Sequence, residues 1–169
     1  MNGGRSRQDA VKRPVTGGER TATGDAFSGL VVRVLRLHGL LTAAGDALTR
    51  PVGQTSARWQ VLAMIEGESH SVAETARTLG LARQSVQRVA DLLAASGLIV
   101  YEANPRHRRA QLMTLTDDGR RALAAIQARQ RPWADAIGAA AGARRLRRLN
   151  EDLDRVLGAV QTADRPDQD

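Results

Sequence analysis

The chain has 169 residues, 25 of them basic and 18 acidic, which gives a formal net charge of +7 at pH 7. That length suits one compact domain with helical extensions, and the positive charge favours a polyanionic partner. Every basic residue except Lys12 is arginine, which suits phosphate and guanine, although a GC-rich genome would produce the same bias. Because the sequence has no cysteine, disulfides, thiolate zinc sites and thiol-based redox sensing are excluded.

Residues 1–24 contain several basic side chains and almost no large apolar ones, so we expect a disordered basic tail. The tail either stays solvated or contacts DNA non-specifically. It lacks the apolar stretch of a secretory signal. The longest uncharged run in the chain, Leu92 to Tyr101, is about half of the roughly 20 residues that a membrane helix needs. We therefore expect an unprocessed cytoplasmic protein without a membrane partner.

An amphipathic helix is predicted over residues 25–50, because apolar side chains recur every three or four positions. These are Leu30, Val34, Leu37, Leu41 and Ala44. The run from Arg50 to Gly53 should end this helix, since it contains Pro51. Ser56 can then cap a second helix that stops near Gly67.

Two short helices follow in close succession. Ser71 and Glu74 have the spacing of a capping box, in which each side chain bonds the backbone amide of the other residue, and Gly80 should end this helix. A second helix is predicted from about Arg83 to Ser96, with Val86, Val89, Ala90 and Leu93 on its inner face. Helices joined by so short a turn form a helix-turn-helix.

The pattern then changes to strands. Residues 98–103 and 110–115 are rich in apolar and extended-favouring side chains, and the segment between them has the sequence Asn-Pro-Arg-His-Arg-Arg. A hairpin directly after a helix-turn-helix makes a winged helix-turn-helix, here over residues 51–116. The wing carries Arg106, His107, Arg108 and Arg109.

The remaining sequence is helical. Thr116 can cap a helix with Asp117 and Asp118 in its first turn, and Pro132 should kink or interrupt it. Gly138 and Gly142 bracket an expected turn before a last helix, and residues 163–169 form a disordered C-terminal tail. The helices over 25–50 and 117–162 carry apolar stripes that the winged unit alone cannot cover, so we expect them to be dimerisation helices of a homodimer. The expected fold class is mainly α with a small β-hairpin.

The second helix of the motif presents a polar outer face. Arginine can bind the O6 and N7 atoms of guanine, glutamine can pair with adenine, and serine can reach bases or phosphates. The wing arginines suit insertion into a minor groove or contacts to flanking phosphates. The alternatives are an ordinary solvated helix face and a solvated loop. The predicted recognition residues are Arg83, Gln84, Ser85, Gln87 and Arg88.

Other chemistries find no support in the sequence. The three histidines, His38, His70 and His107, lie far apart and have no metal-ligand spacing. There is no nucleophile elbow, phosphate-binding loop or dinucleotide fingerprint. We therefore expect no enzyme activity, no metal and no cofactor.

From about Thr55 to Gly119 the sequence resembles the multiple-antibiotic-resistance regulator (MarR) family. The likeness is carried by residues 79–99, Leu-Gly-Leu-Ala-Arg-Gln-Ser through Gly-Leu-Ile, and by residues 104–119, Asn-Pro-Arg-His-Arg-Arg-Ala through Asp-Asp-Gly. Arg83 to Arg88 match the base-reading segment of the family, and Arg109 matches the arginine of its Asp-x-Arg wing motif. Ala82 replaces the usual Ser or Thr helix cap, and His107 replaces the wing aspartate. The histidine suggests a wing that binds phosphate more strongly in mild acid, against the alternative of a neutral side chain without a role.

The resemblance implies a homodimeric transcriptional regulator that binds a pseudo-palindromic operator in double-stranded DNA. Most members of the family are repressors, so the resemblance favours a repressor. Members of the family often leave DNA when a small aromatic or phenolic effector binds. In the family, the effector pocket often lies between the dimer helices and the winged unit. This location makes His38 and Trp59 the expected ligand-binding residues. The alternative is that Trp59 is part of the core. Two other functions stay open: a winged-helix protein-interaction module, and a non-specific architectural DNA-binding protein.

Overall fold

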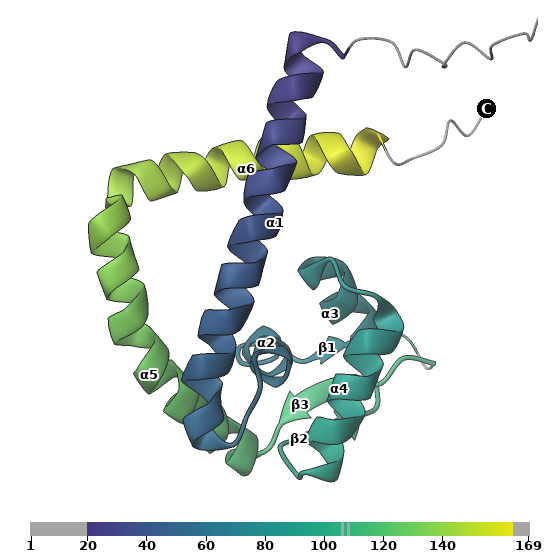
Figure 1. Cartoon of the computed structure of the whole chain (residues 1–169). Coiled ribbons are helices and arrows are strands. Elements are labelled where there is room, and N and C mark those ends of the chain that lie inside the picture. Colours follow the sequence, from purple (N-terminus) through teal and green to yellow (C-terminus); the bar gives the residue numbers. More distant parts are fainter. Residues whose placement is uncertain (1–19, 106, 108, 164–169) are drawn as a thin grey trace, which may run out of the picture. The chain divides into compact units, whose positions relative to one another are not determined.

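The computed structural model describes residues 20–105, 107 and 109–163, and its first element is the long helix α1, Ala22–Thr49 (Figure 1). The helix begins earlier than expected, because the Thr21 hydroxyl caps it by accepting a 3.1 Å hydrogen bond from the amide of Gly24. Asp25 in the first turn favours the same start. Residues 22–24 are therefore helical and do not belong to the predicted tail. Residues 1–19 of that tail and residues 164–169 of the C-terminal tail lie outside the described residues.

The chain divides into two compact units, one ending at Leu40 and the other starting at Leu41. In the first unit, α1 exposes a series of large apolar side chains. They are Phe27, Val31, Val32, Val34, Leu35, Leu37 and Leu40. By length and composition alone the segment Ala22–Val52 could also span a membrane, with a hydropathy of 1.3. Uncharged runs do not reveal this segment, because Arg33 and Arg36 interrupt it. The core helices of soluble proteins can have the same length and hydropathy, so these two properties are weak evidence for a membrane span.

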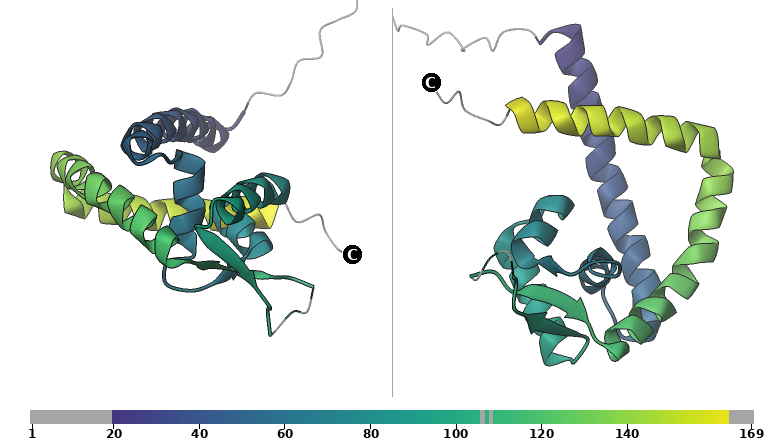
Figure 2. Two further views of the ribbon diagram at one scale, coloured as in Figure 1. Left: turned by 90° about the horizontal axis from the view of Figure 1, so that it is seen from below. Right: turned by 180° about the vertical axis from the view of Figure 1, so that it is seen from behind.

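The second unit contains a winged helix-turn-helix, as predicted. Its elements are the 3-10 helix η1 (Arg50–Val52), α2 (Ser56–Met64), β1 (His70–Ser71), α3 (Val72–Leu79), α4 (Arg83–Ala95), β2 (Ile99–Glu102) and β3 (Leu112–Leu115). The sheet is antiparallel in the order β1-β3-β2, so the expected hairpin gains a third strand. Met113 on β3 pairs with His70 on one side and with Tyr101 on the other. In the left view of Figure 2 the hairpin of β2 and β3 extends from this sheet.

One apolar core holds these elements together. Val86, Ala90 and Leu93 of α4 are buried and Val89 packs against them, which confirms the predicted inner face of that helix. The helix α3 and the strands β2 and β3 supply the other side of the core. The fully buried side chains also include Leu62, Ile99, Met113 and Leu123. This packing fixes the opposite face of α4 toward solvent.

Side-chain caps set most of the helix starts. The capping box of α3 is present, since the Ser71 hydroxyl accepts from the Glu74 amide at 3.3 Å and Glu74 Oε2 accepts from the Ser71 amide at 2.8 Å. Gly80 ends α3 with a φ of 64°, which favours glycine. The cap of α2 is Thr55, so the prediction of Ser56 is wrong. Ser56 is buried in the first turn, where its amide donates to Asp46 Oδ1 at 2.9 Å.

Two helices complete the second unit: α5, Asp117–Ala141, and α6, Ala143–Ala163. Thr116 caps α5, as predicted, by accepting from the Gly119 amide at 3.0 Å. Pro132 lies inside this helix and does not interrupt it, since the helix continues to Ala141. The turn lies at Gly142, which has a φ of 84°, while Gly138 stays helical.

Candidate nucleic-acid interface

The outer face of α4 is polar and open to solvent. Arg83, Gln84, Ser85 and Arg88 are exposed, and Gln87 is half-buried. The helix begins at Arg83 after Ala82, which has no side chain that could cap it. The Ser85 amide donates to the Ala82 carbonyl at 3.0 Å, so within the described residues only the amides of Arg83 and Gln84 in this first turn keep their hydrogens for another acceptor, such as a phosphate oxygen.

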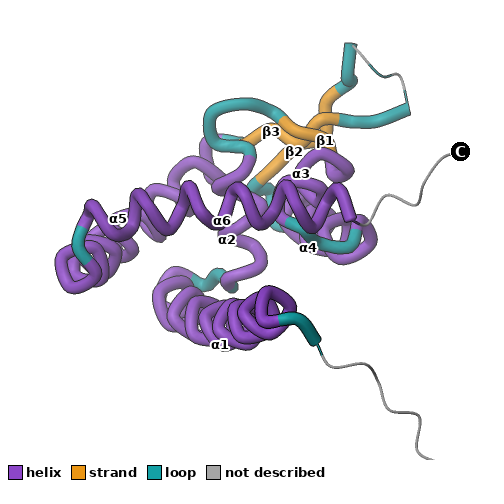
Figure 3. The backbone as a smooth tube through the Cα atoms, turned by 90° about the horizontal axis from the view of Figure 1, so that it is seen from above, coloured by secondary structure: helices purple, strands orange, loops and turns teal. Residues whose placement is uncertain are grey.

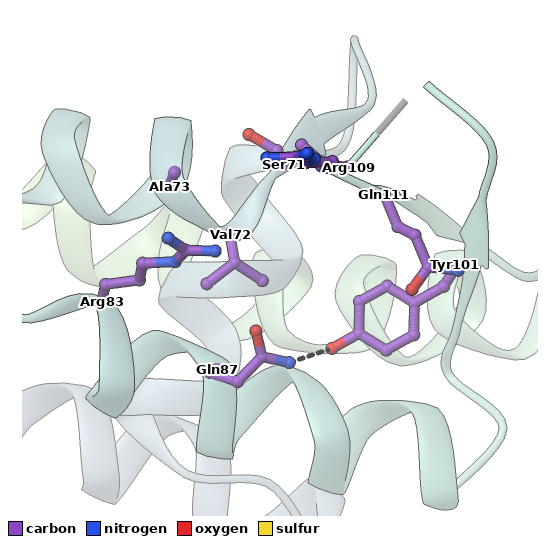
Figure 4. Close-up of a pocket in the computed structure, with 9 residues that line it drawn as sticks. Ser71, Val72, Ala73, Arg83, Gln87, Tyr101, Arg109 and Gln111 are labelled. Atoms are coloured by element: carbon purple, nitrogen blue, oxygen red, sulfur yellow. Dashed lines mark hydrogen bonds between the residues drawn. The ribbon is translucent and has the colours of Figure 1, made fainter. Parts of the chain in front are cut away.

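Gln87 differs from its neighbours because its amide is engaged within the protein. Its Nε2 atom donates to Asp91 Oδ1 at 2.8 Å and to the Tyr101 hydroxyl at 3.1 Å. The same hydroxyl donates to Asp91 Oδ1 at 2.9 Å. These three side chains connect α4 to β2, and Figure 4 shows the Gln87 amide directed at the tyrosine oxygen. No sequence signal indicates this cluster, since the pattern around Tyr101 predicts only a strand.

The wing loop follows β2 and extends beyond the strands (Figure 3). Within it, His107 and Arg109 are exposed. The backbone turns here through hydrogen bonds from the His107 amide to the Asn104 carbonyl at 3.3 Å and from the Ala110 amide to the His107 carbonyl at 2.9 Å. The other two predicted wing residues, Arg106 and Arg108, lie outside the described residues.

A hollow of about 130 Å³ lies between the wing and α4, the predicted recognition helix. Arg83 from the start of α4 and Arg109 from the wing both line it, together with Gln87 and Tyr101. The start of α3 supplies the opposite wall through Ser71 and Ala73 (Figure 4). Two arginines in the lining of one small hollow favour an anionic ligand of the size of a phosphate group.

A second hollow, of about 410 Å³, lies at the base of the wing. It is lined by two histidines and two glutamates, His70, His107, Glu68 and Glu74. Hydrogen bonds from the backbone and the hydroxyl of Ser71 hold the pKa of the Glu74 carboxyl below its usual value. Across residues 20–105, 107 and 109–163, no group of three or more His, Asp or Glu side chains is arranged to hold a metal ion.

Arg58 of α2 holds the C-terminal end of α4. The Nη2 atom of its guanidinium donates to the Leu92 carbonyl at 2.9 Å and to the Ser96 hydroxyl, and the Nη1 atom donates to Gln54 Oε1 at 3.3 Å. A cation at a helix C-terminus is also favoured by the helix dipole. No local sequence signal marks Arg58, because its partners on α4 are more than thirty residues away in the chain.

The two predicted ligand-binding residues have different surroundings. His38 is exposed on α1 in the first unit. Trp59 on α2 is half-buried and packs against the hydrophobic core of the second unit. The position of Trp59 is therefore compatible with the alternative of a core side chain.

A search of protein-family models matches residues 52–110 to the MarR family. Uncharacterized proteins of Mycobacterium tuberculosis and Mycobacterium bovis are both 39% identical to the chain over 146 residues, covering 84% of this chain and 99% of each relative. The chain belongs to the MarR family. The predicted family is thereby confirmed, and the chain is a DNA-binding transcriptional regulator.

Solved structures of other regulators share the fold of this MarR-family chain. The M. tuberculosis regulator MosR, solved in complex with DNA, has a TM-score of 0.68 at 24% identity, with 80% of this chain and 98% of MosR covered. CouR of Rhodococcus jostii RHA1, solved with p-coumaroyl-CoA, has a TM-score of 0.67 at 22% identity, with 81% and 95% covered. BldR of Sulfolobus solfataricus reaches a TM-score of 0.70 at 17% identity, with 80% and 96% covered. The expected fold class, mainly α with a winged helix-turn-helix, is confirmed.

Proposed function

We propose that this regulator is a cytoplasmic repressor that binds a pseudo-palindromic operator as a homodimer and leaves it when a small aromatic or phenolic effector binds. The observation that carries the DNA-binding part is the convergence of Arg83 and Arg109 on one hollow between α4 and the wing. This convergence matches a site where a helix reads bases in the major groove while the wing contacts the flanking phosphates.

The homodimer is supported by the exposed apolar surface of the flanking helices. Besides the series on α1, large apolar side chains are exposed on α5 and α6, at Ile137, Leu149, Leu157 and Val160. Apolar surface of this extent favours a protein partner. A second copy of the chain is the simplest partner, because a two-fold dimer also supplies two recognition helices for the two halves of an operator.

The individual DNA contacts follow from the residue types. Arg83, Gln84, Ser85, Gln87 and Arg88 would face the major groove, and the wing residues His107 and Arg109 would contact the sugar-phosphate backbone. In this proposal Arg106 and Arg108 add charge to the same wing.

The effector is proposed from the family and from one relative. CouR was solved with p-coumaroyl-CoA, an aromatic acyl thioester. For this chain, His38 and Trp59 are the proposed ligand-binding residues, since an imidazole and an indole can stack on an aromatic ring and donate hydrogen bonds to its substituents. Loss of DNA binding on addition of aromatic carboxylic acids or phenols would support the effector.

The experiment that tests DNA recognition is fluorescence anisotropy on the DNA upstream of the gene and on a shuffled duplex, across a salt series. We expect tight preference for the native duplex and a clear salt slope. Arg83→Ala should reduce the discrimination between the two duplexes. Arg109→Ala should weaken both and lower the salt slope by about 1. Arg129→Ala is the control, because it removes the same charge from an exposed position on α5.

Three results would contradict the proposal. Equal and sequence-independent losses from Arg83→Ala and Arg109→Ala would refute the division into base and phosphate contacts. A steep salt slope without sequence preference would favour an architectural DNA-binding protein. No binding to either duplex would favour a protein-interaction module.

The homodimer is tested by sedimentation equilibrium. Leu35→Glu puts a charge on the exposed apolar face of α1, where Leu35 is 65% exposed, and should shift the dimer toward monomer. Val100→Glu on β2 is the matched control, because Val100 is also exposed, at 45%, but lies outside the flanking helices. A parent protein that sediments as a monomer at micromolar concentration would contradict the proposal.

A further inference from the structure

The recognition helix carries two glutamines whose amides stand in different surroundings. Gln84 is exposed, and within the described part of the chain no hydrogen bond holds its amide. Gln87 lies one turn further along, and its amide nitrogen contacts both Asp91 Oδ1 and the Tyr101 hydroxyl, at 2.8 and 3.1 Å. The two side chains are chemically identical, but these contacts leave their amides with different hydrogen-bonding groups for a ligand.

The chemistry of the partners fixes the orientation of the Gln87 amide. A carboxylate can only accept hydrogen bonds, so the end of the amide that faces Asp91 must be the NH₂ group. The Tyr101 hydroxyl uses its one hydrogen on Asp91, at 2.9 Å, and is therefore an acceptor toward Gln87. Both hydrogens of the amide nitrogen are then engaged. Only the carbonyl oxygen, Oε1, is left for a ligand.

The tyrosine keeps this arrangement over the physiological pH range. Burial, followed by the hydrogen bond and the charge of Asp91, raises the pKa of Tyr101 to about 12. The hydroxyl therefore stays protonated and continues to donate to Asp91. No competing protonation state would turn the Gln87 amide around.

We propose that Gln87 reads DNA only as a hydrogen-bond acceptor, and that it selects a base with an amino group in the major groove at one operator position. Cytosine N4 and adenine N6 are the amino groups exposed there, whereas guanine and thymine present acceptors. A glutamine with both ends available can instead bond adenine through N6 and N7 together. Asp91 and Tyr101 are the positioning residues that deny Gln87 this second bond. The assignment rests on the proposed function, because it requires α4 to lie in the major groove.

The test is selection of DNA sites from a library of randomised operators, followed by sequencing of the bound fraction. The parent protein should accept cytosine and adenine alike at one position and disfavour guanine and thymine there. Gln87→Met, which keeps the length of the side chain but has no acceptor oxygen, should lose this preference by about fivefold, the effect of one hydrogen bond.

Release of the amide should change the preference rather than abolish it. The double variant Asp91→Ala with Tyr101→Phe frees both amide hydrogens, so adenine should gain about fivefold over cytosine at the same position. Gln84→Met is the matched control, since it removes the other glutamine of the same helix. It should alter an adenine preference at a different position and leave the Gln87 position unchanged.

Failure of this inference is separable from failure of the proposed function. If Arg83→Ala alters the selected sequence but Gln87→Met alters none, the recognition helix reads DNA and the Gln87 assignment is wrong. A parent protein that requires adenine at the Gln87 position would also overturn it. If the double variant weakens every sequence equally, the cluster only joins α4 to β2. A parent protein without any sequence preference would overturn both proposals.

Discussion

Replacement of Gly119 by alanine would place a methyl group against the backbone of Leu98. Gly119 lies in the first turn of α5 and is buried. An ideal Cβ at this position would be 2.0 Å from the Leu98 carbonyl oxygen, 3.0 Å from the Leu98 carbonyl carbon and 3.2 Å from Leu115 Cδ2. Two of these three atoms are backbone, so no side-chain rotation relieves the contact, and either α5 or the turn before β2 must move.

The cost follows from the kind of contact. Overpacking a core by one methylene costs typically about 1–3 kcal/mol. A contact with a backbone carbonyl lies at the upper end of that range, so we expect a loss of about 3 kcal/mol in the free energy of unfolding. For a chain of this size that loss lowers Tm by roughly 6–12 °C. The gain in helix propensity from alanine is about 1 kcal/mol at most and does not offset it.

The assay is thermal unfolding followed by circular dichroism, at one fixed protomer concentration because dimerisation would shift Tm. Gly138→Ala is the matched control in the same helix, since a methyl group at that position would have no atom within 4 Å among the described residues. It should leave Tm unchanged or raise it through helix propensity. If Gly119→Ala unfolds at the parent temperature or above it, the close approach of α5 to Leu98 is not a feature of the folded protein.

Two further predictions concern the helix starts beside the candidate interface. Ala82→Ser should supply the missing cap of α4 and raise the free energy of unfolding by about 1 kcal/mol, as measured by urea denaturation. An unchanged urea midpoint would contradict the start of α4 at Arg83. The lowered pKa of Glu74 stabilises the fold above its ordinary value of 4.5, and this contribution is lost as the pH falls through the lower folded-state pKa. The stability advantage of the parent over Glu74→Gln should therefore shrink on acidification below pH 4.5, and a constant advantage down to about pH 2 would exclude an electrostatic origin.

Local signals are sufficient to predict the helix-turn-helix. The capping box at Ser71, the left-handed Gly80 and the spacing of Val86, Ala90 and Leu93 each act within one or two turns of chain. Such signals depend on neighbours in the sequence and need no knowledge of the tertiary fold. They place both helices of the motif within a residue of their observed ends.

The errors arise where distant contacts decide the outcome. Thr55 and Ser56 carry the same capping group, and the choice between them is linked to the bond from the Ser56 amide to Asp46 on α1. The strand β1 has only two residues, too few for an alternating pattern, and forms because His70 and Ser71 pair with β3. Pairing of this kind cannot be read from so short a segment.

The candidate site is predictable by residue type but not by geometry. The exposed face of α4 follows correctly from the positions that the core leaves open. The hydrogen bonds of Gln87 to Tyr101 depend on how β2 lies against α4, which helical spacing does not specify. A glutamine with both ends of its amide available and one whose amide hydrogens are already bonded within the protein look alike in a sequence.

The two ends of α4 are held very differently. At its far end Arg58 donates to the Leu92 carbonyl, while Thr116 at the start of α5 donates from its hydroxyl to the Gly97 carbonyl and from its amide to the Leu98 carbonyl, at 2.7 and 3.1 Å. At its near end, beside Ala82, no side-chain cap is present. Hydrogen bonds from α2 and α5 thus anchor one end of the helix, whereas the end that carries Arg83 has no side-chain cap. A phosphate bound at that end would act as the cap that the sequence does not supply.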